Sequence, residues 1–164
     1  GIVDIACKIK PDQATLVPER REEITTEGGL DAVKYFKQVK QATIQLHKRG
    51  IKVSLFIAPV KEQIEAAAES GARIVEFHTG QYALTKTKAA WEKELKRLID
   101  MTVYGKSLGL EINAGHGLKY ANTVSVARIP GMNELNIGHS IISYAVFVGL
   151  ERAVKEMVKL IRDI

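Results

Sequence analysis

The sequence has a single cysteine, Cys7, among 164 residues. One thiol cannot form an intramolecular disulfide bond, which excludes the small disulfide-stabilised secreted domains. No charged-then-apolar signal segment opens the chain, and charged residues interrupt every apolar run well before the roughly 20 residues that a membrane span needs. We therefore expect a cytoplasmic protein without a membrane partner.

Motifs for metals and nucleotides are also missing. The sequence contains no paired cysteines, no His-x-x-x-His, no G-x-x-x-x-G-K-[ST] and no G-x-G-x-x-G, so we expect no metal and no nucleotide cofactor. The net charge is +5 and the pI about 9.3, but the basic residues are spread over the predicted helices, often beside glutamates. This is typical of solvated helix surfaces and predicts no nucleic-acid partner, while small phosphorylated substrates remain compatible with it.

What the chain does contain is an alternation of short strand-like runs and helical patterns. The predicted strands are Ala14 to Glu19, Lys52 to Pro59, Arg73 to Gly80, Leu110 to Gly115 and Glu134 to His139. Three helical faces are predicted from apolar spacing: Phe36, Val39, Thr43 and Leu46; Trp91, Leu95, Leu98 and Thr102; Leu150, Val154, Met157 and Ile161. Gly50, Gly71 and Gly109 stand where left-handed residues end helices. No linker interrupts the pattern, so residues 1–164 are predicted to form one domain.

Successive β-α units predict an α/β fold with a parallel sheet, either an open doubly wound sheet or part of a (β/α)8 barrel. The polar residues favour the barrel. By the period of two, Glu76 and Asn136 lie on the strand face opposite the apolar residues, and Asn113 holds the matching place between them. A polar inner face with functional residues at the carboxyl ends of several strands is typical of a barrel.

His116 lies between Gly115 and Gly117, after the fourth predicted strand. The glycines allow a sharp turn that keeps the imidazole accessible, and an unperturbed histidine titrates near neutral pH. The alternative is a loop histidine that caps a turn. Spacing alone leaves both interpretations open.

Three further groups are candidates for a site. Gly138 and His139, with Gly117, are predicted to form a phosphate cradle at the start of the last helix, or else a tight turn with Ser140 as N-cap. Glu76, within an apolar strand, either forms a structural ion pair or has a functional charge that stabilises a developing cation or steers a histidine. Thr25 belongs to "TTEGG", which is either an ordinary loop or a mobile lid over a phosphate.

Five segments in this order carry a family resemblance: "LVPERREEITTEGGLD", "VSLFIAP", "EFHTGQYA", "NAGHGLKY" and "ELNIGHSII". Over essentially the whole chain, the sequence resembles pyridoxine 5′-phosphate synthase of vitamin B6 biosynthesis. The resemblance implies a (β/α)8 barrel, usually a homo-octamer. It also implies condensation of 3-amino-2-oxopropyl phosphate with 1-deoxy-D-xylulose 5-phosphate, giving pyridoxine 5′-phosphate, phosphate and water.

The resemblance also implies roles for individual residues. His116 matches the family's proton donor, and Glu76 matches the carboxylate that stabilises the transition state. Residues Gly117, Gly138 and His139 match binding positions for the aminoacetone phosphate, and Thr25 matches a substrate contact near the lid.

Members of this family begin with about three further β-α units, which supply general bases that this sequence lacks. The chain is thus expected to be about five units of the barrel, incomplete as an enzyme by itself, with the missing strands in a longer protein or a second polypeptide. Two alternatives to the synthase stay open, namely a phosphate-binding barrel fragment without turnover and another barrel enzyme that uses phosphosugars.

Overall fold

The fold is built on one parallel sheet, seen in a computed structural model that describes residues 1–19 and 28–162. Its strands are β1 (Gln13–Leu16), β2 (Lys52–Ile57), β3 (Ile74–His78), β4 (Glu111–Gly115) and β5 (Met132–Asn136). They pair in chain order, β1-β2-β3-β4-β5, and every pairing is parallel. The predicted α/β architecture with a parallel sheet is confirmed.

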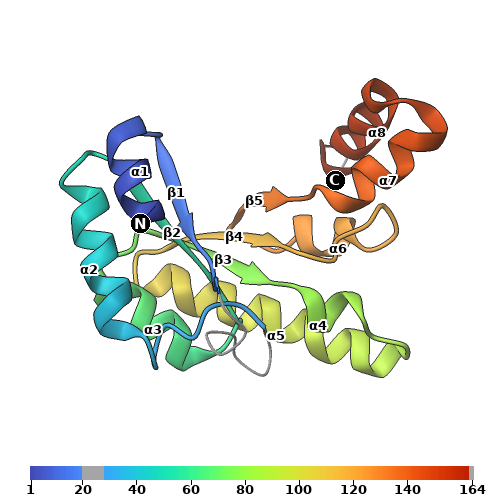
Figure 1. The fold of residues 1–164 in the computed structure, drawn as a ribbon. Helices are drawn as coiled ribbons and strands as arrows, with labels where there is room; N and C mark the ends of the chain where they lie inside the picture. Colours follow the sequence, from blue (N-terminus) through green and yellow to red (C-terminus); the bar gives the residue numbers. More distant parts are fainter. Residues whose placement is uncertain (20–27, 163–164) are drawn as a thin grey trace.

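Helices connect the strands. Those in the first half are α1 (Ile2–Ile9), α2 (Phe36–His47), α3 (Lys61–Ser70) and α4 (Gly80–Ala83). Those in the second half are α5 (Lys88–Ser107), α6 (Thr123–Ala127), α7 (His139–Val148) and α8 (Leu150–Arg162). Helices α2, α3 and α5 lie together along one face of the sheet (Figure 1). Sequence periodicity predicted α2 and α5, and Gly71 marked the end of a helix where α3 ends, whereas α1 was not predicted.

The core lies between these three helices and the sheet. Side chains that alternate along the strands point toward the helices and are fully buried, among them Val53, Leu55, Ile57, Val75, Phe77 and Ile112. Leu46 of α2, Ile64 of α3 and Leu98 of α5 pack against them. The apolar face of the sheet thus holds the fold together and leaves the opposite face available for polar residues.

Phe77 provides a test of this core, because its side chain is 0% exposed. Replacing Phe77 with alanine is expected to lower the free energy of unfolding by about 3–5 kcal/mol, through lost burial and the cavity left behind. Val103→Ala on α5, where the side chain is 61% exposed, should change it by only about 0.5 kcal/mol. Urea denaturation of the complete protein that carries this sequence measures both, and equal losses would contradict the assigned core.

The polar face follows from strand register. Glu76 pairs with Asn113 across β3 and β4, and Gly115 pairs with Asn136 across β4 and β5. Residues paired in this way project to the same side of a parallel sheet. The predicted polar face that carries Glu76, Asn113 and Asn136 is therefore confirmed.

Helix α8 corrects one prediction. Its Met157 and Ala153 are buried, but Leu150 is 55% and Val154 41% exposed, so the predicted stripe of Leu150, Val154, Met157 and Ile161 does not cover the sheet. The reason is tertiary: α8 packs on α7 and α6, and the α7–α8 pair lies beyond the end of the sheet (Figure 1). The apolar spacing of α8 predicted a buried face but could not show that this face packs on other helices and not on the sheet.

The strand boundaries also need correction. The predicted strands run past the observed ends, most clearly at β5, which ends at Asn136 rather than at His139. Pairing with β4 stops at Gly115–Asn136, and Gly138 is the N-cap of α7, so His139 begins the helix. The last connection is therefore a strand, a two-residue turn and a helix.

Candidate active site

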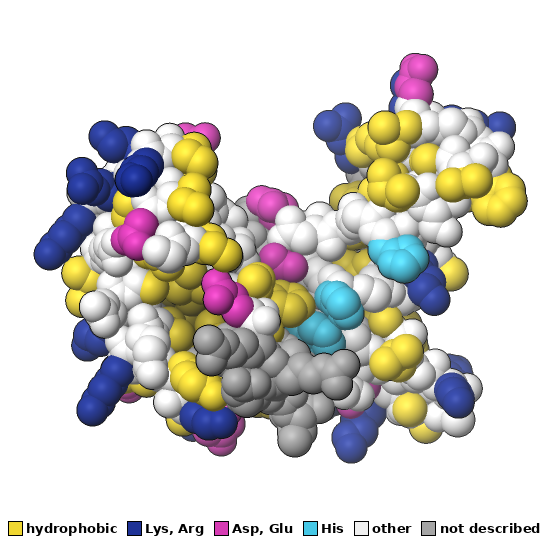
Figure 2. Space-filling model, in the orientation of Figure 1, with side chains coloured by type: hydrophobic (Ala, Val, Ile, Leu, Met, Phe, Trp, Pro, Cys, Tyr) yellow, Lys and Arg dark blue, Asp and Glu magenta, His cyan; other side chains and the backbone are white. Residues whose placement is uncertain are grey.

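A cavity of about 820 Å³ opens at the carboxyl ends of the strands, on the polar side of the sheet. Glu76, His116, Asn136, Gly138 and His139 line it. Figure 2 shows histidine side chains on the wall of the hollow between the N-terminal elements and the α7–α8 pair. Parallel strands bring their carboxyl ends to one edge, so side chains distant in sequence meet there.

The loop after β4 presents His116. His116 itself has a φ of 72° and Gly117 a φ of 83°, so two consecutive residues are left-handed. The Thr79 hydroxyl lies within hydrogen-bonding distance of the carbonyl oxygens of Gly115 (2.8 Å) and His116 (2.6 Å). A Cβ on Gly117 would lie 2.8 Å from the Cβ of Ala83. The turn is thus fixed by close packing and by Thr79, and it leaves the His116 side chain exposed to the cavity.

Aromatic rings surround His116. Its ring stacks on the ring of His78, with centroids 4.7 Å apart and an interplanar angle of 26°. Phe56, from β2, contacts His78 edge-on at 5.3 Å and lies 6.3 Å from His116. Three successive β-α units therefore each contribute one ring to this cluster, in which Phe56 and His116 line the cavity and His78 packs between them.

Glu76 is a partly buried carboxylate on the floor of the cavity. Its Oε2 accepts a hydrogen bond from Asn136 Nδ2 at 2.8 Å. Among residues 1–19 and 28–162, Glu76 forms no ion pair. The structure therefore gives no support to the interpretation of Glu76 as half of a structural ion pair. Burial raises the pKa of Glu76 above its ordinary value of 4.5, the Asn136 hydrogen bond opposes this, and the charge of Glu134 raises the pKa further. The site thus holds a carboxylate whose proton affinity is increased.

This pKa shift predicts a pH-dependent effect of Glu76→Gln. The folded protein binds the Glu76 proton more tightly than the unfolded chain, so stability falls as the pH rises from about 4.5 through the folded pKa. Glutamine removes that loss, so the variant should melt at a higher temperature than the unchanged protein at pH 7.5, with the advantage disappearing at pH 4. Thermal melts of the complete protein at both pH values measure it, and a pH-independent difference would contradict the buried carboxylate.

The start of α7 forms another part of the wall. Gly138 is the N-cap, and the side chain of His139 is exposed at the cavity. The first amides of a helix have no intrahelical acceptor and favour anions. Ser140 is not the N-cap; its hydroxyl donates to the carbonyl oxygen of Leu118 at 2.9 Å and ties α7 to the loop after His116. The Ser140 N-cap of the tight-turn alternative is thus wrong.

The candidates from the sequence are mostly brought together. His116, Glu76, Gly117, Gly138 and His139 all line the one cavity, whereas Thr25 lies outside the described residues. Sequence reasoning missed His78 as a neighbour of His116. It also missed apolar lining residues, namely Phe56, Leu118, Ile137 and Phe147. Phe56 shares the strand face of Glu76 by register, which is the signal that could have identified it.

Within residues 1–19 and 28–162, no group of three or more histidine, cysteine, aspartate or glutamate side chains could hold a metal ion. No helix in the same part of the chain is long and apolar enough to span a lipid bilayer.

Solved structures support the barrel architecture. The YdjI aldolase from Escherichia coli K12 superimposes with a TM-score of 0.58 at 16% identity, over 99% of this chain and 62% of the aldolase. A xylose isomerase domain protein from Planctomyces limnophilus gives a TM-score of 0.57 at 11% identity, over 98% and 66%. At such low identity the likeness concerns the fold, which is that of TIM-barrel proteins.

Sequence relatives are much closer. The pyridoxine 5′-phosphate synthase of Synechococcus sp. (strain JA-2-3B'a(2-13)) is 58% identical over 156 residues, 95% of this chain and 65% of the relative. That of Coxiella burnetii (strain RSA 493 / Nine Mile phase I) is 53% identical over 160 residues, 98% and 67%. The chain thus spans about two thirds of the length of these relatives. The model of the family described as pyridoxal phosphate biosynthesis protein PdxJ matches residues 1–163, and the chain belongs to that family.

Proposed function

We propose that the protein carrying this chain is a pyridoxine 5′-phosphate synthase. It condenses 3-amino-2-oxopropyl phosphate with 1-deoxy-D-xylulose 5-phosphate and releases pyridoxine 5′-phosphate, phosphate and water. The single observation that carries the proposal is the cavity at the strand ends, where His116, Glu76, Gly138 and His139 meet. Relatives that bear this enzyme's name are 50–58% identical to the chain.

His116 acts as the proton donor in this proposal. Its ring is exposed to the cavity from a fixed left-handed turn, and an imidazole can deliver a proton to a leaving oxygen near neutral pH. Glu76 lies on the floor of the same cavity, partly shielded from water and held by Asn136. In this setting a carboxylate stabilises positive charge that develops on the condensing nitrogen more strongly than it would in bulk water.

Gly117, Gly138 and His139 bind the phosphate of the aminoacetone substrate. Gly138 and His139 open α7, where unpaired amides and the helix dipole favour an anion. Gly117 offers its backbone without a side chain at the same cavity, in the loop that the Ser140 hydroxyl ties to the start of α7 through Leu118. Thr25 supplies a substrate contact in the same proposal, although it lies outside the described residues.

The wider setting follows from the same proposal. Residues 1–164 act as one domain that supplies about five units of a (β/α)8 barrel. The enzyme is a cytoplasmic homo-octamer. Gel filtration of the complete protein with light scattering measures the subunit number, and a monomer would overturn the octamer.

The test is product formation by the complete protein from both substrates, followed by the appearance of pyridoxine 5′-phosphate. Calorimetry with 3-amino-2-oxopropyl phosphate alone runs in parallel. Product above the uncatalysed rate supports the synthase. Heat of binding without product would instead favour a phosphate-binding barrel without turnover, and turnover of a different phosphosugar would favour another barrel enzyme.

A further inference from the structure

The ring of His116 has no hydrogen-bond partner among the residues that the structure describes, although its backbone is firmly held. A proton donor has to keep its ring nitrogen aimed at the reacting oxygen, and a misplacement of about 1 Å can cost about 100-fold in rate. In many sites a carboxylate or carbonyl orients the histidine through its second nitrogen. Among the described residues, the contacts that can orient the ring are those with the two aromatic rings beside it, His78 and Phe56.

The closer of the two is the His78 ring. The centroid separation of 4.7 Å and the interplanar angle of 26° match an offset stack, a preferred arrangement of flat rings. The two histidines come from adjacent strands, and His78 pairs with Gly115, the residue before His116. Strand register therefore places the His78 ring directly beside the turn that carries His116.

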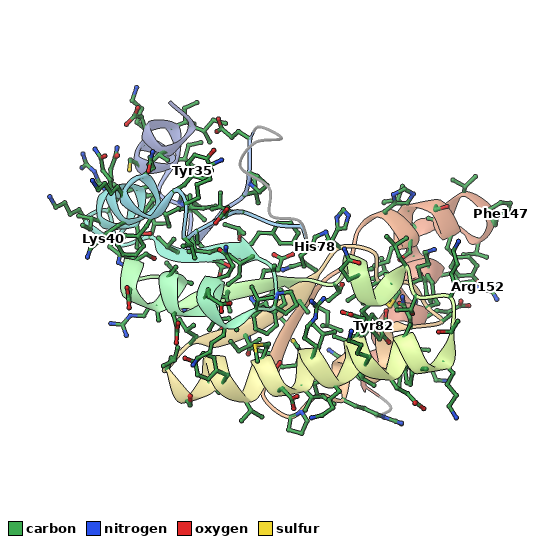
Figure 3. The ribbon with its side chains drawn as sticks, turned by 90° about the horizontal axis from the view of Figure 1, so that it is seen from below. Tyr35, Lys40, His78, Tyr82, Phe147 and Arg152 are labelled. Atoms are coloured by element: carbon green, nitrogen blue, oxygen red, sulfur yellow. The ribbon has the colours of Figure 1, made fainter. Side chains whose placement is uncertain are left out.

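His78 is itself held in place. Phe56 meets its ring edge-on, at 5.3 Å and 69°. The ring also occupies space left by two glycines, because a Cβ on Gly28 or on Gly80 would collide with it. Figure 3 shows His78 between the N-terminal elements and the α7–α8 pair, at the centre of the molecule. The ring is a fixed surface on which His116 can rest.

We infer that His78 is a positioning residue that orients the His116 ring by stacking. This rests on the proposed role of His116 as proton donor. It adds a residue that contributes a flat ring surface rather than a proton.

The first experiment needs no substitution. Nuclear Overhauser spectra of the complete protein, with histidine rings labelled, should show cross-peaks between the ring protons of His78 and those of His116. Their absence would overturn the inference. Because this readout needs no substrate, it stands or falls independently of the synthase proposal.

The second experiment compares His78→Ala with His78→Phe. Alanine removes the stack and is expected to lower kcat about 10- to 100-fold with little change in KM, as ring misplacement does. Phenylalanine restores a flat ring and should recover kcat to within about 3-fold. His47→Ala, an exposed histidine at the end of α2, is the matched control and should leave kcat unchanged.

If His78→Phe is as impaired as His78→Ala, the imidazole chemistry of His78 matters and the stacking role is wrong. If His78→Ala keeps full kcat, the role is also wrong. If the variants do not fold, the cross-peaks of the unchanged protein decide. If the unchanged protein makes no product but the cross-peaks are present, the proposed function fails while the ring contact stands.

Discussion

His116→Gln is expected to lower kcat of the complete protein by about 10²- to 10⁴-fold, the contribution of a general acid. Glutamine keeps a polar side chain at a position whose left-handed backbone, φ 72°, is already constrained. It removes the group that can deliver a proton. Binding of 3-amino-2-oxopropyl phosphate should change little, because the proposed phosphate contacts are made by Gly117, Gly138 and His139. Steady-state kinetics and calorimetry on the same samples measure the two effects separately.

The control for this prediction is His47→Gln. It removes an exposed histidine at the end of α2, distant in sequence from His116. It should keep full kcat. A loss smaller than 10-fold in His116→Gln, or an equal loss in the control, would rule out His116 as the proton donor.

Gly115→Ala is expected to lower kcat about 100-fold, because a displaced carboxylate no longer faces the developing charge. A Cβ at Gly115 would collide with Glu76 Oε1, and would lie 3.1 Å from the carbonyl oxygen of Asn136. The end of the Glu76 side chain can swing away, so the fold should survive with a melting temperature lowered by about 5 °C or less. Steady-state kinetics and a thermal melt measure the two effects.

A double-mutant cycle assigns the loss to Glu76. If the methyl group of Gly115→Ala acts by moving the carboxylate, the substitution should add little to the loss already caused by Glu76→Gln. Full additivity of the two losses in ΔΔG‡ would show that Gly115→Ala acts elsewhere in the site.

The sequence predicts the sheet and the helices that cover it, because the signals for them lie within a few residues along the chain. Alternation along β3 is enough to place Glu76 on one side and Phe77 on the other, and glycine at position 71 is enough to end α3 in the left-handed conformation. The candidate cavity follows from the same logic, since parallel strands deliver His116 and Glu76 to one edge. For these features, strand alternation and parallel strand order are sufficient to predict which side chains lie together.

Other features depend on tertiary packing and could not be predicted in this way. Leu150 and Val154 of α8 are exposed because this helix does not lie on the sheet. The spacing of apolar residues along a helix does not show which element the helix packs on. The stack of His78 on His116 needs the register of β3 and β4 and the left-handed φ of His116 together. The flanking glycines predicted a turn, but His116 takes the left-handed conformation together with Gly117.

The most direct test of the site is a titration of the isotope-labelled complete protein with 3-amino-2-oxopropyl phosphate, followed by backbone amide NMR. The proposed site predicts the largest shifts at Gly117, Gly138 and His139, with Gly50 and Gly71 at the far ends of α2 and α3 unaffected. Shifts that cluster away from the carboxyl ends of the strands, or none at saturating ligand, would contradict it.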